Sequence, residues 1–531
     1  MSNGTATSNA GVEGPQGYLG GNDGFRGWFD TRDHKRIGML FLCWTLGVFL
    51  LGALFAVIMK LRASSGLVDT PTYHKMLTQH GLLMVFFFVV PAIPSILGYF
   101  LLPLQLGAAN LAVPRLSLCS LRIYAVGTLL FVMSIAVGAV STGWTFMTPF
   151  ALGGDGAFAL LAVGLFFVAL SWFMTGLNFI ITVHYRRAEA MGFFDMPVLS
   201  WALYLTGYML LAVGILFGII VLYLASARTF GKGLFSTETD PLVWQNYFWF
   251  VTTPAAFFAL LPAVGVISEV IAGISRKAVA GYRTLVGSMI ALLAMSFVTW
   301  GVRLIGSGQD PATSFVFGAL SILTVIPVAL IVYSWLATLH RGSIACAAPT
   351  TFVVSFLLQA GIGAVMSLFL SSLAVGQYLA NTLFVTAHSH YVMMGGVMTA
   401  LLAGLHYWWP KLTGRRYHEG LGRFSAMLYT VGLNLAFFPQ IIQGVRGVPR
   451  GVYELPAELA GLEIVSMTGV WILVTGIVVI ASNLLGSLWD GARAVNNPWG
   501  ATTLEWQAAS PPPAENFATA PTVTGPYETV Q

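Results

Sequence analysis

Three histidines lie inside long apolar segments of this 531-residue chain. His80 stands in the string TQHGLLM, while His388 and His390 stand two residues apart in TAHSHY. A polar side chain in such surroundings is costly unless it is paired or bound to a ligand, so it indicates a function. Imidazole is also the side chain that binds metal ions most often. The three histidines are therefore candidate metal ligands.

The spacing of His388 and His390 indicates which kind of metal group they could hold. Residues two apart on a helix point about 200° from each other, so this pair faces opposite sides of one helix. A single ion cannot easily bind both, whereas two flat macrocycles beside the helix can each take one axial imidazole. Gly81, next to His80, leaves room for such a ring near the backbone. The alternative is three buried histidines bonded to neighbouring carbonyls, but the set as a whole favours heme iron.

Composition predicts the elements that must position these histidines. Hydrophobic residues make up 57% of the chain and charged residues 8%, whereas a soluble domain carries about a quarter charged residues. The apolar runs recur along the whole chain and are long enough, at about 20 to 30 residues each, to cross a bilayer. We therefore predict an all-α integral membrane protein with twelve transmembrane helices. The predicted helices start near residues 37, 77, 121, 157, 199, 244, 282, 314, 350, 380, 425 and 462.

Three regions follow from this pattern. We predict a cytoplasmic N-terminal segment over 1–31, a heme-binding membrane domain over 32–495 and a cytoplasmic C-terminal tail over 496–531. An even number of spans puts both ends on one side, and most loop Lys and Arg residues fall on the side of Lys35 and Arg36. By the positive-inside rule that side is cytoplasmic. We expect the inner membrane of a bacterium as the location and lipid as a surrounding partner.

The remaining histidines and the cysteines predict structural roles. The other six histidines fall in loops or at helix ends, where interfacial or packing roles are expected: His34, His74, His184, His340, His406 and His418. Cys43, Cys119 and Cys346 form no CxxC pair, so neither a zinc site nor a disulfide framework is indicated.

Several strings together resemble subunit I of cytochrome c oxidases, in the heme–copper oxidase superfamily, over essentially the whole length. They are DHKRIG at 33–38, HGLLM at 80–84, GWT at 143–145, SWLAT at 334–338, FFPQ at 437–440 and NPWGATTLEW at 497–506. The resemblance implies the fold of that subunit and two hemes, whose type (a, b or o) the sequence does not specify.

The resemblance also implies roles for individual residues. His80 and His390 would ligate a low-spin heme, and His388 would be the proximal ligand of a second, high-spin heme. Three further residues would contact the cofactors: Arg450 at the heme propionates, Lys60 near the edge of the low-spin heme, in place of an arginine, and Trp144 in the GWT string.

The copper site of the family is not matched. The family string His-Pro-Glu-Val-Tyr is replaced by Thr253-Pro-Ala-Ala-Phe257, and Trp-Ala-His-His by Trp-Gly-Val302-Arg303. All three copper-binding histidines and the cross-linked tyrosine are thereby lost. Neither Thr, Val nor Arg can replace imidazole as a copper ligand. We expect no copper in this chain and a degenerate site formed by these four residues.

The proton-delivery positions of the family also differ. The lysine of one proton path corresponds to Ile331, the entry aspartate of the other to Asn110, and a magnesium-site His-Asp pair to Ala380-Asn381. These losses argue against oxygen reduction coupled to proton pumping. Arg303 within a span is itself costly, so it either extends to the membrane surface or lies over the second heme.

Three functions stay open on this basis. The best-supported prediction is a heme-carrying core subunit of a respiratory complex, which transfers electrons from the bis-histidine heme to the second heme. The alternatives are a true terminal oxidase or other copper-free reductase (of O2, peroxide or NO) at the high-spin heme, and a non-catalytic heme scaffold or gas sensor. Expected partners are a cupredoxin-type subunit II, a subunit III and a cytochrome c-type donor, and no nucleic acid.

Overall fold

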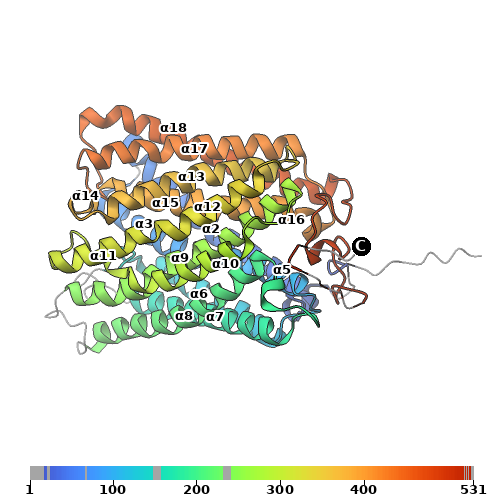
Figure 1. Cartoon of the computed structure of the whole chain (residues 1–531). Helices are drawn as coiled ribbons and strands as arrows, with labels where there is room; N and C mark the ends of the chain where they lie inside the picture. The colour runs from blue at the N-terminus through green and yellow to red at the C-terminus, as the bar shows by residue number, and fades with distance from the viewer. Residues whose placement is uncertain are drawn as a thin grey trace, which may run out of the picture.

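The computed structural model describes residues 17–20, 24–65, 68–146, 157–230, 241–519, 521, 523 and 525–527. Much of the predicted N-terminal segment, 1–16 and 21–23, lies outside these residues. The described chain is mainly helical, and its long helices run side by side in one bundle (Figure 1).

The helices of the first half include one span built from five consecutive segments, α3 to α5. In chain order they are α1 (Gly24–Phe29), α2 (His34–Ser65), α3 (Thr70–Leu82), η1 (Leu83–Val89), α4 (Val90–Ile93), η2 (Pro94–Gly98), α5 (Tyr99–Gln105), α6 (Pro114–Gly138), α7 (Ala157–Tyr185), η4 (Phe193–Asp195), α8 (Val198–Phe230) and α9 (Pro241–Ser275).

The second half contains a similar composite span that carries His388 and His390. Its elements are α10 (Tyr282–Val298), η5 (Trp300–Leu304), α11 (Pro311–Leu323), α12 (Val325–Leu339), α13 (Ala348–Ser371), α14 (Leu373–Leu379), α15 (Leu383–Val392), η6 (Met393–Met398), α16 (Thr399–Thr413), α17 (Glu419–Val445), η7 (Ala457–Leu459), α18 (Ala460–Asp490) and η8 (Leu504–Trp506).

Ten helical segments of the described chain are long and apolar enough to cross a membrane, which makes this an integral membrane protein with an all-helical fold. The two further predicted spans correspond to α10, with 17 residues, and to the continuous helix from α15 through η6 to α16. The count of twelve therefore stays a prediction. The predicted starts near 77 and 121 fall furthest from the observed ones, at Thr70 and Pro114.

Neighbouring helices approach closely where both carry glycine. A Cβ atom on Gly127 of α6 would lie 2.7 Å from the Gly164 carbonyl of α7, and one on Gly176 of α7 would lie 2.4 Å from the Gly207 carbonyl of α8. In a bilayer, where lipid offers no hydrophobic drive for association, small residues at such crossings allow close backbone packing. These contacts assemble the α6–α7–α8 layer, at the bottom of Figure 1.

Three π-helical stretches, η1, η2 and η6, interrupt the helices that carry the candidate ligands, and two of them closely follow a histidine. The stretch η1 begins three residues after His80, and η6 begins three residues after His390. A π-helical turn inserts an extra residue and changes the direction of the side chains that follow, and such turns are frequent at functional sites. Periodicity in the sequence predicted none of these stretches.

The chain after α18 lies across one end of the bundle (Figure 1). Lys35 is fully buried there, and its ammonium donates to the Asn516 side chain at 2.9 Å and pairs with Asp33 at 3.0 Å. Lys411 is also fully buried and donates to the Ala508 carbonyl. The tail is thus ordered by contact, and it supplies polar partners to two lysines at this end of the helices.

Candidate functional site

His80 and His390 face each other from α3 and α15. Their ring centroids lie 6.3 Å apart, and their planes are inclined by only 12°. Imidazole nitrogens bind metal ions at about 2.0 Å, so one ion held between two Nε2 atoms separates the ring centroids by roughly 6 Å. The observed separation therefore fits one iron atom between the two rings.

Hydrogen bonds fix which nitrogen each ring can offer. Nδ1 of His80 donates to the Gly52 carbonyl of α2 at 2.9 Å, and Nδ1 of His390 donates to the Thr386 carbonyl at 2.8 Å. Because a carbonyl only accepts, both rings carry the proton on Nδ1 and leave the Nε2 lone pair free. This is the usual arrangement behind a metal-bound histidine. Phe437 of α17 stacks on His390 at 4.0 Å and holds its ring in place.

The residue beside His80 has a different use from the one expected. A Cβ atom on Gly81 would lie 2.8 Å from Cβ of Trp144, so the indole, and not a macrocycle, fills the space over this glycine. Trp144 also makes an edge-to-face contact with Trp249 of α9 at 5.7 Å. Trp144 therefore connects the His80 helix to α9.

Lys60 and Arg450 lie near this pair in different ways. Lys60 pairs with Glu463 at 3.2 Å and donates to Ser466 at 3.0 Å, and it lies close enough for its charge to act on His390. Arg450 is exposed in the loop between α17 and α18, and its backbone N–H donates to the Asn381 carbonyl. A Cβ atom on the adjacent Gly451 would touch Leu77, three residues before His80. The loop of Arg450 thus reaches the His80 end of α3.

His388 points to a different neighbour. It is 5% exposed, and its Nε2 lies 2.7 Å from the Ser367 hydroxyl of α13, while its Nδ1 is buried without a hydrogen-bond partner. An imidazole with one unsatisfied nitrogen inside a bundle is costly, which fits a site meant to hold a further group. The two histidines of α15 therefore lie in two separate sites, His390 opposite His80 and His388 beside Ser367.

The positions that replace the copper ligands lie on two elements that pack together, α9 and η5. Thr253 is 1% exposed and its hydroxyl has no hydrogen-bond partner, and Phe257 packs against the core one turn further along α9. Val302 and Arg303 lie on η5, which packs against α9, and the charge of Arg303 acts on His388. Within the described ranges, no three His, Cys, Asp or Glu side chains come together as a metal-binding group.

Sequence reasoning missed four residues that touch these sites. Gly52 and Ser367 bind the histidines through a carbonyl and a hydroxyl, which carry no strong sequence signal. Gln245 and Trp249, by contrast, precede Thr253 at intervals of four residues on α9. That spacing places all three on one face of the helix and could have identified them.

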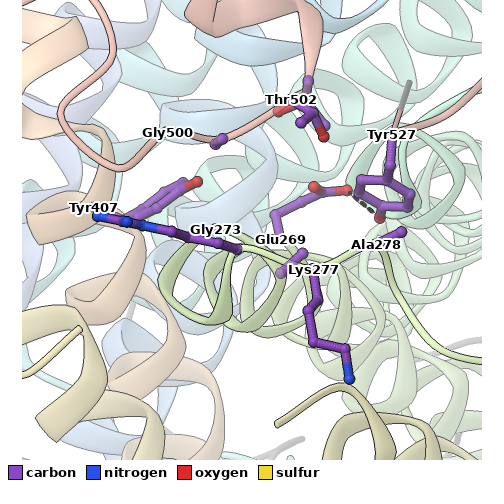
Figure 2. Close-up of a pocket in the computed structure, with 12 residues that line it drawn as sticks. Glu269, Gly273, Lys277, Ala278, Tyr407, Gly500, Thr502 and Tyr527 are labelled. Atoms are coloured by element: carbon purple, nitrogen blue, oxygen red, sulfur yellow. Dashed lines mark hydrogen bonds between the residues drawn. The ribbon is translucent and has the colours of Figure 1, made fainter. Parts of the chain in front are cut away.

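A second polar site lies at the tail end of the bundle (Figure 2). Glu269 of α9, which is 2% exposed, accepts hydrogen bonds from the Leu199 backbone at 3.2 Å and from the Tyr527 hydroxyl at 3.1 Å. A cavity of about 60 Å³ adjoins this pair, and Tyr407 and Thr502 line it. The tail thus completes a small polar chamber far along α9 from Thr253.

Glu505 of the tail provides a test by pH. It is fully buried, with one oxygen accepting from Gln105 and Trp408 and the other without a partner, and burial raises the pKa of its carboxyl above the usual value of about 4.5. The folded state holds this proton more tightly than the unfolded chain, so stability should fall as pH rises from the unfolded pKa through the folded one. In thermal unfolding of the detergent-solubilised protein, Glu505→Gln should flatten that decline. If stability declines with pH as steeply in Glu505→Gln as in the unmodified protein, the Glu505 carboxyl is not the group responsible.

Comparisons with known proteins agree with this architecture. The family model described as "Cytochrome C and Quinol oxidase polypeptide I" matches residues 36–492. The chain is 33% identical over 503 residues to cytochrome c oxidase subunit 1 of Synechocystis, covering 93% of this chain and 91% of the relative. It is 29% identical over 511 residues to quinol oxidase subunit 1 of Bacillus subtilis strain 168, covering 93% and 78%.

A solved structure shares the fold. Its title describes a "heme-copper terminal oxidase dimer", and the chain matches it with a TM-score of 0.75 at 15% identity, covering 87% of this chain and 85% of that one. Family membership implies heme cofactors and assembly with other oxidase subunits. With a match over most of its length and relatives above 30% identity, the chain belongs to the cytochrome c and quinol oxidase polypeptide I family.

Proposed function

We propose that this chain is a heme-carrying core subunit that transfers electrons from a bis-histidine site to a second site at His388, without copper-dependent O2 reduction or proton pumping. The observation that carries the proposal is the contrast between the His80–His390 pair and the positions where the family binds copper. The facing rings of His80 and His390, each with its Nδ1 bonded to a backbone carbonyl, support a heme-ligand pair at the first of these. Thr253, Val302 and Arg303 leave no imidazole at the copper positions.

The residues of the chain determine what the bound groups can do. Heme supplies one-electron chemistry when it is bound. His80 and His390 would both ligate that iron and so exclude other ligands from it. His388 would be the ligand that holds the second heme, because Arg303 and Thr253 are not metal ligands of comparable strength. Arg450 and Lys60 would stabilise the negative propionates by charge.

The location and partners belong to the same proposal. We place the chain in a bacterial inner membrane with both termini cytoplasmic, since the basic loop residues favour that side. No cupredoxin-type segment is evident in the sequence, so a subunit II would supply the electron-accepting copper centre. A subunit III and a cytochrome c-type donor would complete the complex.

Metal analysis of the purified chain tests the proposal. We expect about two hemes per chain by pyridine–hemochrome assay, one held by His80 and His390 and one by His388. Copper should be present only at trace level. Carbon monoxide should bind the reduced protein at the His388 site only. Stoichiometric copper in this chain, or failure to retain any heme, would refute it.

One observation favours a second candidate function. Arg303 places a cation near His388, and a cation over a histidine-ligated heme could stabilise a developing anion during reduction of peroxide, O2 or NO. Steady-state oxygen consumption with a reduced cytochrome donor separates the two. Turnover in the ordinary enzyme range, about 1 to 10³ s⁻¹, would favour this reductase over the electron-transfer subunit.

A further inference from the structure

Arg303 is a cation inside the bundle without a matching anion. Its guanidinium lies over the Trp249 ring at 5.7 Å, and its Nε is buried without a hydrogen-bond partner. No ion pair joins Arg303 to any carboxylate of the described residues. The contact with the indole face offsets part of the desolvation of the cation, but it satisfies none of the guanidinium N–H groups.

The face of α9 beneath Arg303 carries two more unsatisfied groups. The indole N–H of Trp249 donates to Oε1 of Gln245 at 3.1 Å, which fixes the orientation of the amide because an indole nitrogen can only donate. The Gln245 NH2 group is then buried without a partner. One turn beyond Trp249, the Thr253 hydroxyl is also buried and unpartnered, in a side chain only 1% exposed.

These groups share one chemical property. A guanidinium, an amide NH2 and a hydroxyl can all donate, and they come from one face of α9 and from η5, which packs on it. Buried donors are nearly always satisfied in proteins, so three together indicate an acceptor that binds there. Since Arg303 brings an uncompensated positive charge, the acceptor that fits is an anion.

We propose that Arg303, Gln245 and Thr253 form a binding site for a small monovalent anion with two adjacent oxygens, that is, a carboxylate or a nitrite-like oxyanion. The planar fork of guanidinium matches two such oxygens at once. The anion could be free in solution, or it could be the propionate carboxylate of a porphyrin held at His388. The site depends on the donors of this chain and not on the electron-transfer role.

Isothermal titration of the detergent-solubilised holoprotein with sodium nitrite and sodium formate tests the free-anion source. Arg303→Gln should weaken anion binding at least about tenfold. Arg303→Lys should weaken it less, because lysine keeps the positive charge although it loses the planar fork. Thr253→Val and Gln245→Leu, which each remove one donor, should weaken it about three- to tenfold each. Arg186→Gln, at an exposed arginine outside the site, is the matched control and should leave the affinity unchanged.

Infrared difference spectra of the same samples test the propionate source. If the carboxylate belongs to the porphyrin, neither salt binds, but its stretching band shifts in Arg303→Gln and not in Arg186→Gln. The near-isosteric Thr253→Val variant reports the same shift should Arg303→Gln fold poorly. If neither salt binds and the band is unmoved in these variants, or if binding is equally strong in Arg303→Gln, the site is not an anion site.

Discussion

Substitution of His390 by alanine should remove one heme and leave the other. The imidazole of His390 supplies one of the two facing ligands, its Nδ1 is already committed to the Thr386 carbonyl, and Phe437 holds its ring in place. A heme held by His80 alone loses one axial bond and the low-spin state that two imidazoles produce. The pyridine–hemochrome ratio should therefore fall by about half, from about two hemes per chain to about one.

His184 provides the matched control for this experiment. It lies at the end of α7, where its Nε2 contacts the Tyr204 hydroxyl at 2.8 Å, and it approaches neither candidate ligand. His184→Ala should keep the heme content and the low-spin absorption spectrum of the unmodified protein. A His390→Ala variant that retains both would show that His80 and His390 hold no heme between them.

Restoring three imidazoles should create a copper site where the family has one. In Thr253→His, Val302→His and Arg303→His combined, one histidine would come from α9 and two from η5, which packs against it. Imidazole is a strong ligand for copper, and α9 still contains Pro254 and Pro262 in the family register. Copper per chain, measured by elemental analysis after dialysis, should rise from trace to about one.

The single variant Thr253→His is the control for the combined change. One imidazole should not retain copper through dialysis, so the metal content should stay at trace level. Equal copper in the unmodified protein and the triple variant would mean that Thr253, Val302 and Arg303 do not stand at a vacated copper site.

The membrane architecture could be predicted from the sequence because apolar length is a strong and local signal. Ten of the predicted spans have counterparts that are long and apolar enough to cross a membrane. The span that carries His388 and His390 was predicted from the same runs, although its histidines and aromatic residues make it more polar. The facing arrangement of His80 and His390, and the π-helical stretches that follow each of them, depend on contacts between helices that the order of residues does not reveal.

The immediate neighbours of the site could not be predicted for a different reason. The sequence suggests that Gly81 makes room for a macrocycle, whereas the Trp144 side chain takes that space from a loop 63 positions away. Ser367 is one of many serines in apolar helices, and nothing in its local string distinguishes it. Gln245 and Trp249 had a readable spacing, but their meaning depends on Arg303 lying over them.

The tail that lies across one end of the bundle also determines at which stage of synthesis the chain can complete its folding. The His34 imidazole, near the start of the first long helix, contacts the Asn516 side chain, and the two residues are 482 positions apart. The ribosome must therefore have made nearly the whole chain before Asn516 reaches His34 and Lys35, and until then these two buried side chains keep only their nearer partners, the Tyr99 carbonyl and Asp33. A cell that degrades incomplete chains has here a feature that distinguishes a truncated translation product, which lacks Asn516, from one that carries the tail.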